Sequence, residues 1–417
     1  MEKETTKQEH NNAQTKKLHR RYKIMALLIF LSILCILSNK FFLPDKARIY
    51  NDYVIREAAA KQLNKNEEDL TGEDIESITK LTIVDRSMKG YYISGVGLYD
   101  IKLLKKFKNL RELDLSHIRP IRREIPKWKK PFVKLNIIKI SKIPLLDLKP
   151  LRGLTNLRIL DLSHTRISTL EPIKDLKNLR VLKLFYSNVS DIEPLRNLEN
   201  LQVLEFFGTN VSNIEPIKNL EKLHKLSLYS TDVIDFEPLR GLTSLEMLYL
   251  DNANISNLEP VKDLKNLRSI NLYGTKITDL EPLRGLTNLQ ILGLSHTNIS
   301  NLEPIKDMGN LRRLYFKSTT VDSLEPLRGL ENLQELQFYN TKDSDLEPIK
   351  DLKNLLELAL SMTDGIDLEP LKELTNLKDL YIFKFNNINK DQIKDLKKAL
   401  PELRIHENTG DVGELYL

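Results

Sequence analysis

Prolines that recur every 22 residues constrain this fold more than any other feature of the 417-residue sequence. They keep one register without a slip from the first to the last: Pro150, Pro172, Pro194, Pro216, Pro238, Pro260, Pro282, Pro304, Pro326, Pro348 and Pro370. Self-similarity at a fixed period of this size is the signature of a repeat architecture. We therefore expect one long array of stacked units instead of the two or three separate domains that the length alone suggests.

Leucines recur in the same register as the prolines. Around most prolines the sequence reads L-E-P-[LIV]-[RK]-x-L-x-x-L-x-x-L-x-L, and L-x-x-L-x-L at a spacing of roughly 20–29 residues is typical of leucine-rich repeats. The chain resembles this family over residues 70–405. The resemblance implies an α/β solenoid, with a curved parallel sheet on the concave side and short helices on the convex side.

One repeat shows how the pattern folds. At residues 160–162 (Leu-Asp-Leu) the leucines point inward and Asp161 points outward, because side chains of a strand alternate between its faces. Residues 171–173 (Glu-Pro-Ile) start a short helical turn, and proline suits the first position of a helix. The pattern predicts about fifteen strands, near Leu81, Leu113, Ile138 and Leu160, then every 22 residues to Leu380, with a last one near Leu403.

Two polar columns accompany the repeats. Glutamate stands before every one of these prolines except Pro150, with a basic residue three positions after the glutamate, as in Glu171 and Lys174. These pairs predict exposed ion pairs on the convex side. Threonine stands where this family often carries asparagine, and we expect its hydroxyl groups to form a stacked hydrogen-bond ladder: Thr165, Thr209, Thr231, Thr275, Thr297, Thr319, Thr341 and Thr363.

The N-terminal segment has the features of a membrane anchor. Residues 1–23 end in a basic cluster, and the run that follows is almost wholly apolar and extends to Leu43. A basic flank before an apolar stretch of roughly 20 residues predicts a cytoplasmic tail at 1–23, a transmembrane helix or signal anchor at 24–43, and an extracytoplasmic repeat domain.

Two other interpretations of this segment stay open. A cleaved signal peptide would leave a secreted protein, but Ser38 is the only small residue near a cleavage site. A lipoprotein would be lipidated at Cys35, but the residue before it is Leu34 and not a small one.

Both ends of the repeat array show covering elements. Residues 44–80 predict a linker and a helical cap, with one helix over 54–63 and a second that Thr71 caps. This stretch is similar to the caps of bacterial repeat proteins that include the internalins, and the 22-residue unit with its EPL turn also resembles the internalin type. Repeats fill 81–406, with a longer helix over 391–400, and 407–417 form a short tail.

Aromatic residues recur at strand positions that face outward from the core. We predict a partner-binding surface on the concave face, because exposed aromatic side chains often dominate binding energy: Phe185, Phe207, Tyr229, Tyr249, Tyr273, Tyr315, Tyr339, Tyr381 and Phe383. The competing explanation is that large side chains simply suit strands. We expect a protein partner, and the sequence does not distinguish a protein from a glycan.

Residues 116–143 interrupt the repeat register and carry many lysines and arginines against one acid, Glu124. They either bind an anionic surface or form a degenerate repeat with a solvated loop.

No motif of the chain predicts chemistry. It has one cysteine, no His-x-x-x-His pair and a net charge of +6, so we expect no metal, no cofactor, no nucleic-acid binding and no enzymatic activity. The expected function is a membrane-anchored interaction module. The alternative is a cytoplasmic or secreted regulatory scaffold that binds an enzyme such as a phosphatase. The sequence leaves the partner and the oligomeric state open.

Overall fold

The computed structural model describes residues 54–84, 101–117, 147–338, 345–361, 366–383 and 390–408. Several predicted features lie outside these ranges: the tail 1–23, the anchor 24–43, most of the basic stretch 116–143, Thr341, Thr363, Tyr339 and the end of the C-terminal tail. Among the helices that the structure describes, none is long and apolar enough to cross a membrane.

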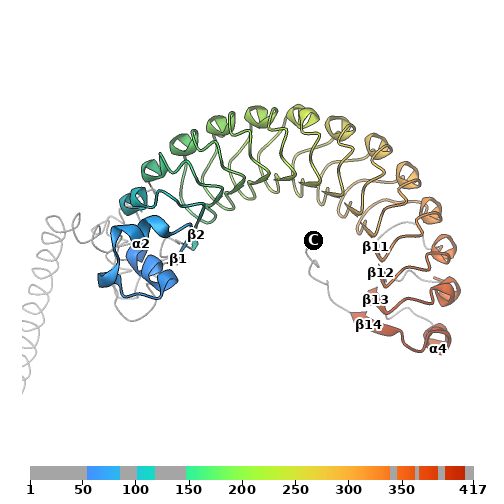
Figure 1. Cartoon of the computed structure of the whole chain (residues 1–417). Helices are drawn as coiled ribbons and strands as arrows, with labels where there is room; N and C mark the ends of the chain where they lie inside the picture. Colours follow the sequence, from blue (N-terminus) through green and yellow to red (C-terminus); the bar gives the residue numbers. More distant parts are fainter. Residues whose placement is uncertain are drawn as a thin grey trace, which may run out of the picture.

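The described strands form one parallel sheet in which each strand pairs with the next along the chain, as in a solenoid. Figure 1 shows the sheet lining the inside of an arc, with helical turns along the outside. Its fourteen strands are β1 Lys80–Val84, β2 Glu112–His117, β3 Ile159–Asp161, β4 Val181–Lys183, β5 Val203–Glu205, β6 Lys225–Ser227, β7 Met247–Tyr249, β8 Ser269–Asn271, β9 Ile291–Gly293, β10 Arg313–Tyr315, β11 Glu335–Phe338, β12 Glu357–Ser361, β13 Asp379–Phe383 and β14 Arg404–Asn408.

The strand predicted near Ile138 lies outside the described residues, and the sheet leaves no place for it between β2 and β3. β2 pairs directly with β3, and Leu113 lies opposite Leu160, so no strand lies between them. Across this pair the backbone N–H of Arg158 donates to the carbonyl of Arg111 at 2.7 Å, as Arg180 does to Arg158 one repeat later. The repeats that contain β2 and β3 therefore stack on each other in the ordinary way.

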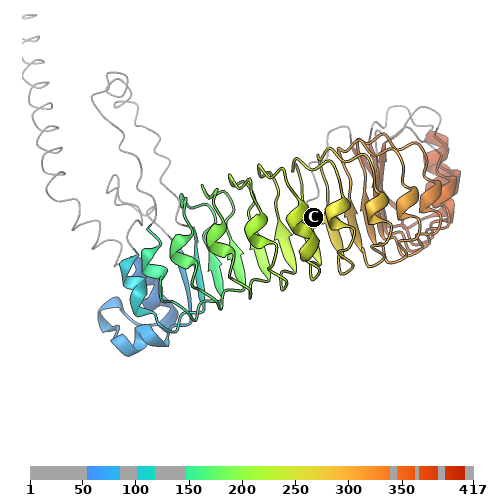
Figure 2. The same cartoon turned by 90° about the horizontal axis from the view of Figure 1, so that it is seen from above.

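Short 3-10 helices form the convex side, and Figure 2 shows them in a row along the arc. Their bounds are η2 Lys102–Lys106, η4 Lys149–Leu151, η5 Glu171–Ile173, η6 Glu193–Leu195, η7 Glu215–Ile217, η8 Glu237–Gly241, η9 Glu259–Val261, η10 Glu281–Leu283, η11 Glu303–Ile305, η12 Glu325–Leu327, η13 Glu347–Ile349 and η14 Glu369–Glu373. Proline is the second residue of these turns from η4 onward, and not the first as predicted.

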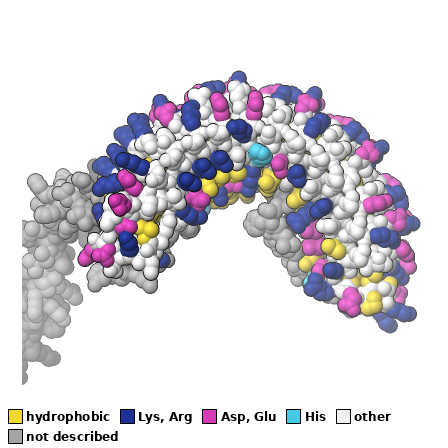
Figure 3. Space-filling model, in the orientation of Figure 1, with side chains coloured by type: hydrophobic (Ala, Val, Ile, Leu, Met, Phe, Trp, Pro, Cys, Tyr) yellow, Lys and Arg dark blue, Asp and Glu magenta, His cyan; other side chains and the backbone are white. Residues whose placement is uncertain are grey.

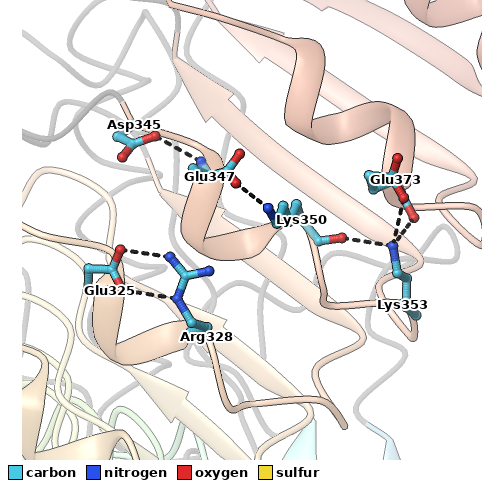
Figure 4. Close-up of polar contacts among 7 residues, drawn as sticks. All are labelled: Glu325, Arg328, Asp345, Glu347, Lys350, Lys353 and Glu373. Atoms are coloured by element: carbon cyan, nitrogen blue, oxygen red, sulfur yellow. Dashed lines mark hydrogen bonds and ion pairs between the residues drawn. The ribbon is translucent and has the colours of Figure 1, made fainter.

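Polar contacts fix each turn, as Figure 4 shows for η12 and η13. The backbone N–H of Glu347 donates to Asp345 Oδ1 at 2.9 Å, which satisfies a donor at the helix start. The carboxylate of Glu347 then pairs with Lys350, and Glu325 pairs with Arg328 in the same way at 2.8 Å. The predicted convex ion pairs are confirmed, but they are exposed, so solvent screens them and each contributes little to stability.

The ladder between repeats is made by asparagine and not by threonine. Thr275 Oγ1 donates to Leu272 O of its own repeat at 2.7 Å, so the predicted threonine ladder is wrong. Another column of side-chain amides reaches a backbone carbonyl of the preceding repeat, 23 residues back: Asn178, Asn200, Asn266, Asn288, Asn310, Asn332, Asn354 and Asn376. These bonds satisfy turn carbonyls that face no strand partner.

The inward leucines form one continuous core along the array. The helix over 54–63 and α2 (Gly72–Ser77) precede β1, and the apolar residues Ile55 and Ile75 join the same core. Thr71 and Asp74 form a capping box at the start of α2. The hydrogen bond from Lys65, followed by those from Thr71, lowers the pKa of Asp74 to about 2.

After the last full repeat, α4 (Lys390–Ala399) packs on the core and leads into β14. The longer helix predicted there is confirmed.

Candidate functional site

Six of the nine predicted binding residues line one shallow groove on the concave face, over β4 to β10: Phe185, Phe207, Tyr229, Tyr249, Tyr273 and Tyr315. The groove has a volume of about 280 Å³. Figure 3 shows apolar side chains with charged neighbours along the inside of the arc. The parallel register places equivalent positions of successive repeats side by side, so residues 22 positions apart form one continuous surface.

The rings at the N-terminal end of the groove contact one another. Phe207 and Tyr229 are stacked, with ring centroids 4.1 Å apart and an interplanar angle of 8°. Phe185 meets Phe207 edge-on at 6.1 Å. Aromatic pairs in these geometries stabilise each other beyond the area they bury. Because the two stacked rings cover one face of each other, a partner meets mainly their edges and the outer faces of the row.

Tyr186 belongs to this surface and the sequence reasoning missed it. Its side chain is 52% exposed, and its ring centroid lies 4.5 Å from that of Phe207. The contact passes over Gly208, where an added Cβ would lie 2.7 Å from Tyr186 Cδ1. Glycine at residue 208 leaves the space that this contact needs, and it adopts its φ of +64° without strain.

The backbone of Tyr186 has a positive φ, and this conformation sets the direction of its side chain. The same conformation recurs every 22 residues, at the position after the aromatic column: His164, Tyr186, Gly208, Ser230, Asn252, Gly274, His296 and Ser318. Non-glycine residues in this conformation are strained. Glycine and asparagine favour a positive φ, so their recurrence at this position of the repeat is the sequence signal that indicates this turn.

Of the other three predicted aromatics, Tyr339 lies outside the described residues, and Tyr381 and Phe383 do not line the groove. The ring of Tyr381 stacks on His406 at the C-terminal end, with centroids 4.4 Å apart. Phe383 lies on the same strand and is half-buried. Tyr381 and Phe383 therefore lie apart from the six residues that line the groove.

Three acidic residues lie side by side on β11, β12 and β13: Glu335, Glu357 and Asp379. Glu335 is paired with Arg313 at 2.9 Å and accepts a hydrogen bond from the hydroxyl of Tyr315 at 2.7 Å. Burial, then this hydrogen bond, raises the pKa of Tyr315. Within the described residues, the carboxylate of Glu357 accepts a single side-chain hydrogen bond, from the amide of Gln337 at 3.4 Å. Burial, followed by repulsion from both acidic neighbours, raises its pKa.

This geometry predicts a pH-dependent effect of Glu357→Gln. A folded-state pKa above the usual 4.5 means that ionised Glu357 destabilises the fold, and the penalty grows as pH rises through that pKa. We expect the variant to melt at a higher temperature than the wild type at pH 7, with the difference gone near pH 4. Thermal melts at both values measure this. Glu335→Gln, which removes a partner of Arg313, should instead lower the melting temperature at pH 7. An equal shift of Glu357→Gln at both pH values would contradict the assignment.

In the part of the chain that the structure describes, no group of His, Cys, Asp and Glu side chains is arranged to hold a metal ion. The groove instead combines aromatic edges with a few charged groups. That arrangement suits binding of a surface or a segment of another molecule.

Comparisons with known proteins show which proteins these repeats resemble. A family model described as leucine-rich repeats (2 copies) matches residues 155–197 and 265–307. An internalin (InlF) structure from Listeria monocytogenes is 24% identical, with 85% of this chain and 94% of that chain covered and a TM-score of 0.67. A leucine-rich repeat protein of Leptospira interrogans is also 24% identical, with 73% and 74% covered and a TM-score of 0.52. No curated protein matches the chain.

These likenesses concern the fold, and they agree with the strand order and the repeating turns described above. Solenoids of this kind use the extended concave surface for binding. The chain carries leucine-rich repeats and folds as an internalin-like solenoid.

Proposed function

We propose that this chain binds a polypeptide partner in its concave groove while residues 24–43 hold it in a membrane, with the repeats on the non-cytoplasmic side. The observation that carries the binding proposal is the gathering of six aromatic side chains in one groove, at positions where the core does not require them. Aromatic residues in partly desolvated clusters are typical binding hot spots.

The ring geometry favours a polypeptide over a glycan. A sugar ring stacks best on a flat, open aromatic face, but Phe207 and Tyr229 cover one face of each other at 4.1 Å. Their remaining edges, with the phenol hydroxyl groups and nearby charged side chains, suit the mixed apolar and polar surface of a polypeptide.

The binding proposal predicts a large effect of changing Phe207, Tyr229 and Tyr273 together to Ser. Peptides selected from a phage-displayed random library on the full-length chain should lose at least about a hundredfold in affinity, because three central aromatic contacts disappear. Titration with the selected peptides measures the loss, and circular dichroism should stay unchanged since these side chains lie outside the core.

The matched control changes three exposed convex lysines, Lys262, Lys306 and Lys350, to Ser. These residues form only surface ion pairs, so peptide affinity should stay within about twofold of the wild type. Unchanged affinity in the concave variant, or an equal loss in both variants, would remove the proposal.

The support for the membrane part is the apolar run beginning at residue 24 and the basic cluster before it. We expect external protease on intact spheroplasts to digest the repeats and leave a small N-terminal fragment in the membrane fraction. Protection of a membrane-bound repeat domain would invert the topology and favour a cytoplasmic regulatory scaffold. Soluble protein outside the cells that starts near residue 39 would identify a cleaved signal peptide.

A further inference from the structure

Glu205 is the least expected side chain in the groove. It stands at the end of β5 on the concave side, yet it is only 5% exposed. Lys225 Nζ lies 2.8 Å from Glu205 Oε1. The second oxygen, Oε2, is buried and has no hydrogen-bond partner among the described residues. A carboxylate oxygen out of water without a donor is unfavourable, so this site would gain from a donor supplied by a bound molecule.

Lys225 shows what kind of group fits next to Glu205. Its ammonium contacts the carboxylate and also lies 5.3 Å from the centre of the Tyr249 ring, within the range of a cation–π interaction. The Glu205 carboxylate and the Tyr249 ring, here called the cradle, therefore already hold one cation, the ammonium of Lys225. The flexible lysine stem allows this ammonium to move aside or to share the carboxylate.

Within the groove, carboxylates outnumber cationic side chains only near the cradle, because Lys317 lines the groove further along. Over β5 to β7 the groove is lined by two carboxylates, Glu205 and Asp251, and by one ammonium, Lys225. Asp251 accepts a hydrogen bond from the neutral amide of Asn271. Lys183 lies next to Glu205 in the strand register, but it forms no ion pair with Glu205 within the described residues and does not line the groove.

We propose that Glu205 recognises a basic side chain of the polypeptide partner, which inserts beside Phe207, Tyr229 and Tyr249 and donates to Glu205 Oε2. This inference rests on the proposed function and names the chemistry of the partner at one point. Arginine fits better than lysine, because its planar guanidinium can lie against a ring while one N–H group donates to the carboxylate.

The test uses two small probes on the full-length chain: Nα-acetyl-arginine methylamide and its neutral counterpart, Nα-acetyl-citrulline methylamide. Titrations followed by saturation-transfer NMR should show the arginine probe binding at least about tenfold more tightly, as expected for a charge-assisted hydrogen bond. Glu205→Gln should abolish this preference. Lys225→Met, which removes the internal cation, should strengthen arginine binding by about threefold or more.

Glu246→Gln is the matched control, because Glu246 is paired with Arg268 at 3.3 Å and does not line the groove; it should keep the arginine preference. Equal binding of the two probes, no binding of either, or a preference that survives in Glu205→Gln would overturn the inference. If Lys225→Met does not fold, the comparison of wild type with Glu205→Gln still decides. The peptide titrations with the Phe207, Tyr229 and Tyr273 variant test the proposed function separately, so the two failures are distinguishable.

Discussion

Leu226→Asp is expected to unfold the repeats around β6. Leu226 is 0% exposed and lies in the continuous core between Leu204 and Leu248. A carboxylate placed there has no partner, and burying an unpaired charge is among the few changes that cost more than about 4 kcal/mol. Since each repeat contacts only its neighbours, hydrogen exchange should lose protection first over about residues 200–250, and the thermal melt should become broader.

Ile234→Asp is the matched control for this change. Ile234 lies in the same repeat, but its side chain is 74% exposed, so the same substitution should alter stability by less than about 0.5 kcal/mol. A Leu226→Asp melt identical to that of the wild type would contradict the assignment of this leucine to the core.

Phe316→Ala is expected to have the second largest effect. Phe316 is 0% exposed, and its ring stacks on that of Phe338 with centroids 5.4 Å apart and an angle of 7°. Truncating a buried phenylalanine to alanine leaves a cavity and costs about 3–5 kcal/mol. Chemical denaturation should show this loss, and hydrogen exchange should place it in the repeats that contain β10 and β11.

Phe316→Leu tests the cause of that loss. Most other repeats carry leucine at this position, as Leu272 and Leu294 do, so the site accepts a leucine side chain and the cost should stay below about 1.5 kcal/mol. Equal losses for the alanine and leucine variants would show that cavity formation is not the cause.

The two predictions from sequence that differ from the structure share a physical origin. The strand near Ile138 was inferred from a local apolar pattern, but pairing in the sheet depends on which repeat stacks on which. The threonine hydroxyls reach a carbonyl within their own turn, whereas the longer amides of residues such as Asn288 reach a carbonyl of the preceding repeat. In both cases the sequence shows which groups are available, and the stacking of repeats selects their partners.

By itself, the sequence determined the solenoid, the inward leucines and the outward aromatic columns. It could do so because the period of apolar residues reports directly which side of each strand is buried. Only the tertiary structure decided that Tyr186 crosses Gly208 to reach Phe207 and that Glu205 is buried with one oxygen unpaired. These contacts join residues about 22 positions apart, and they depend on how neighbouring repeats pack, which no local pattern contains.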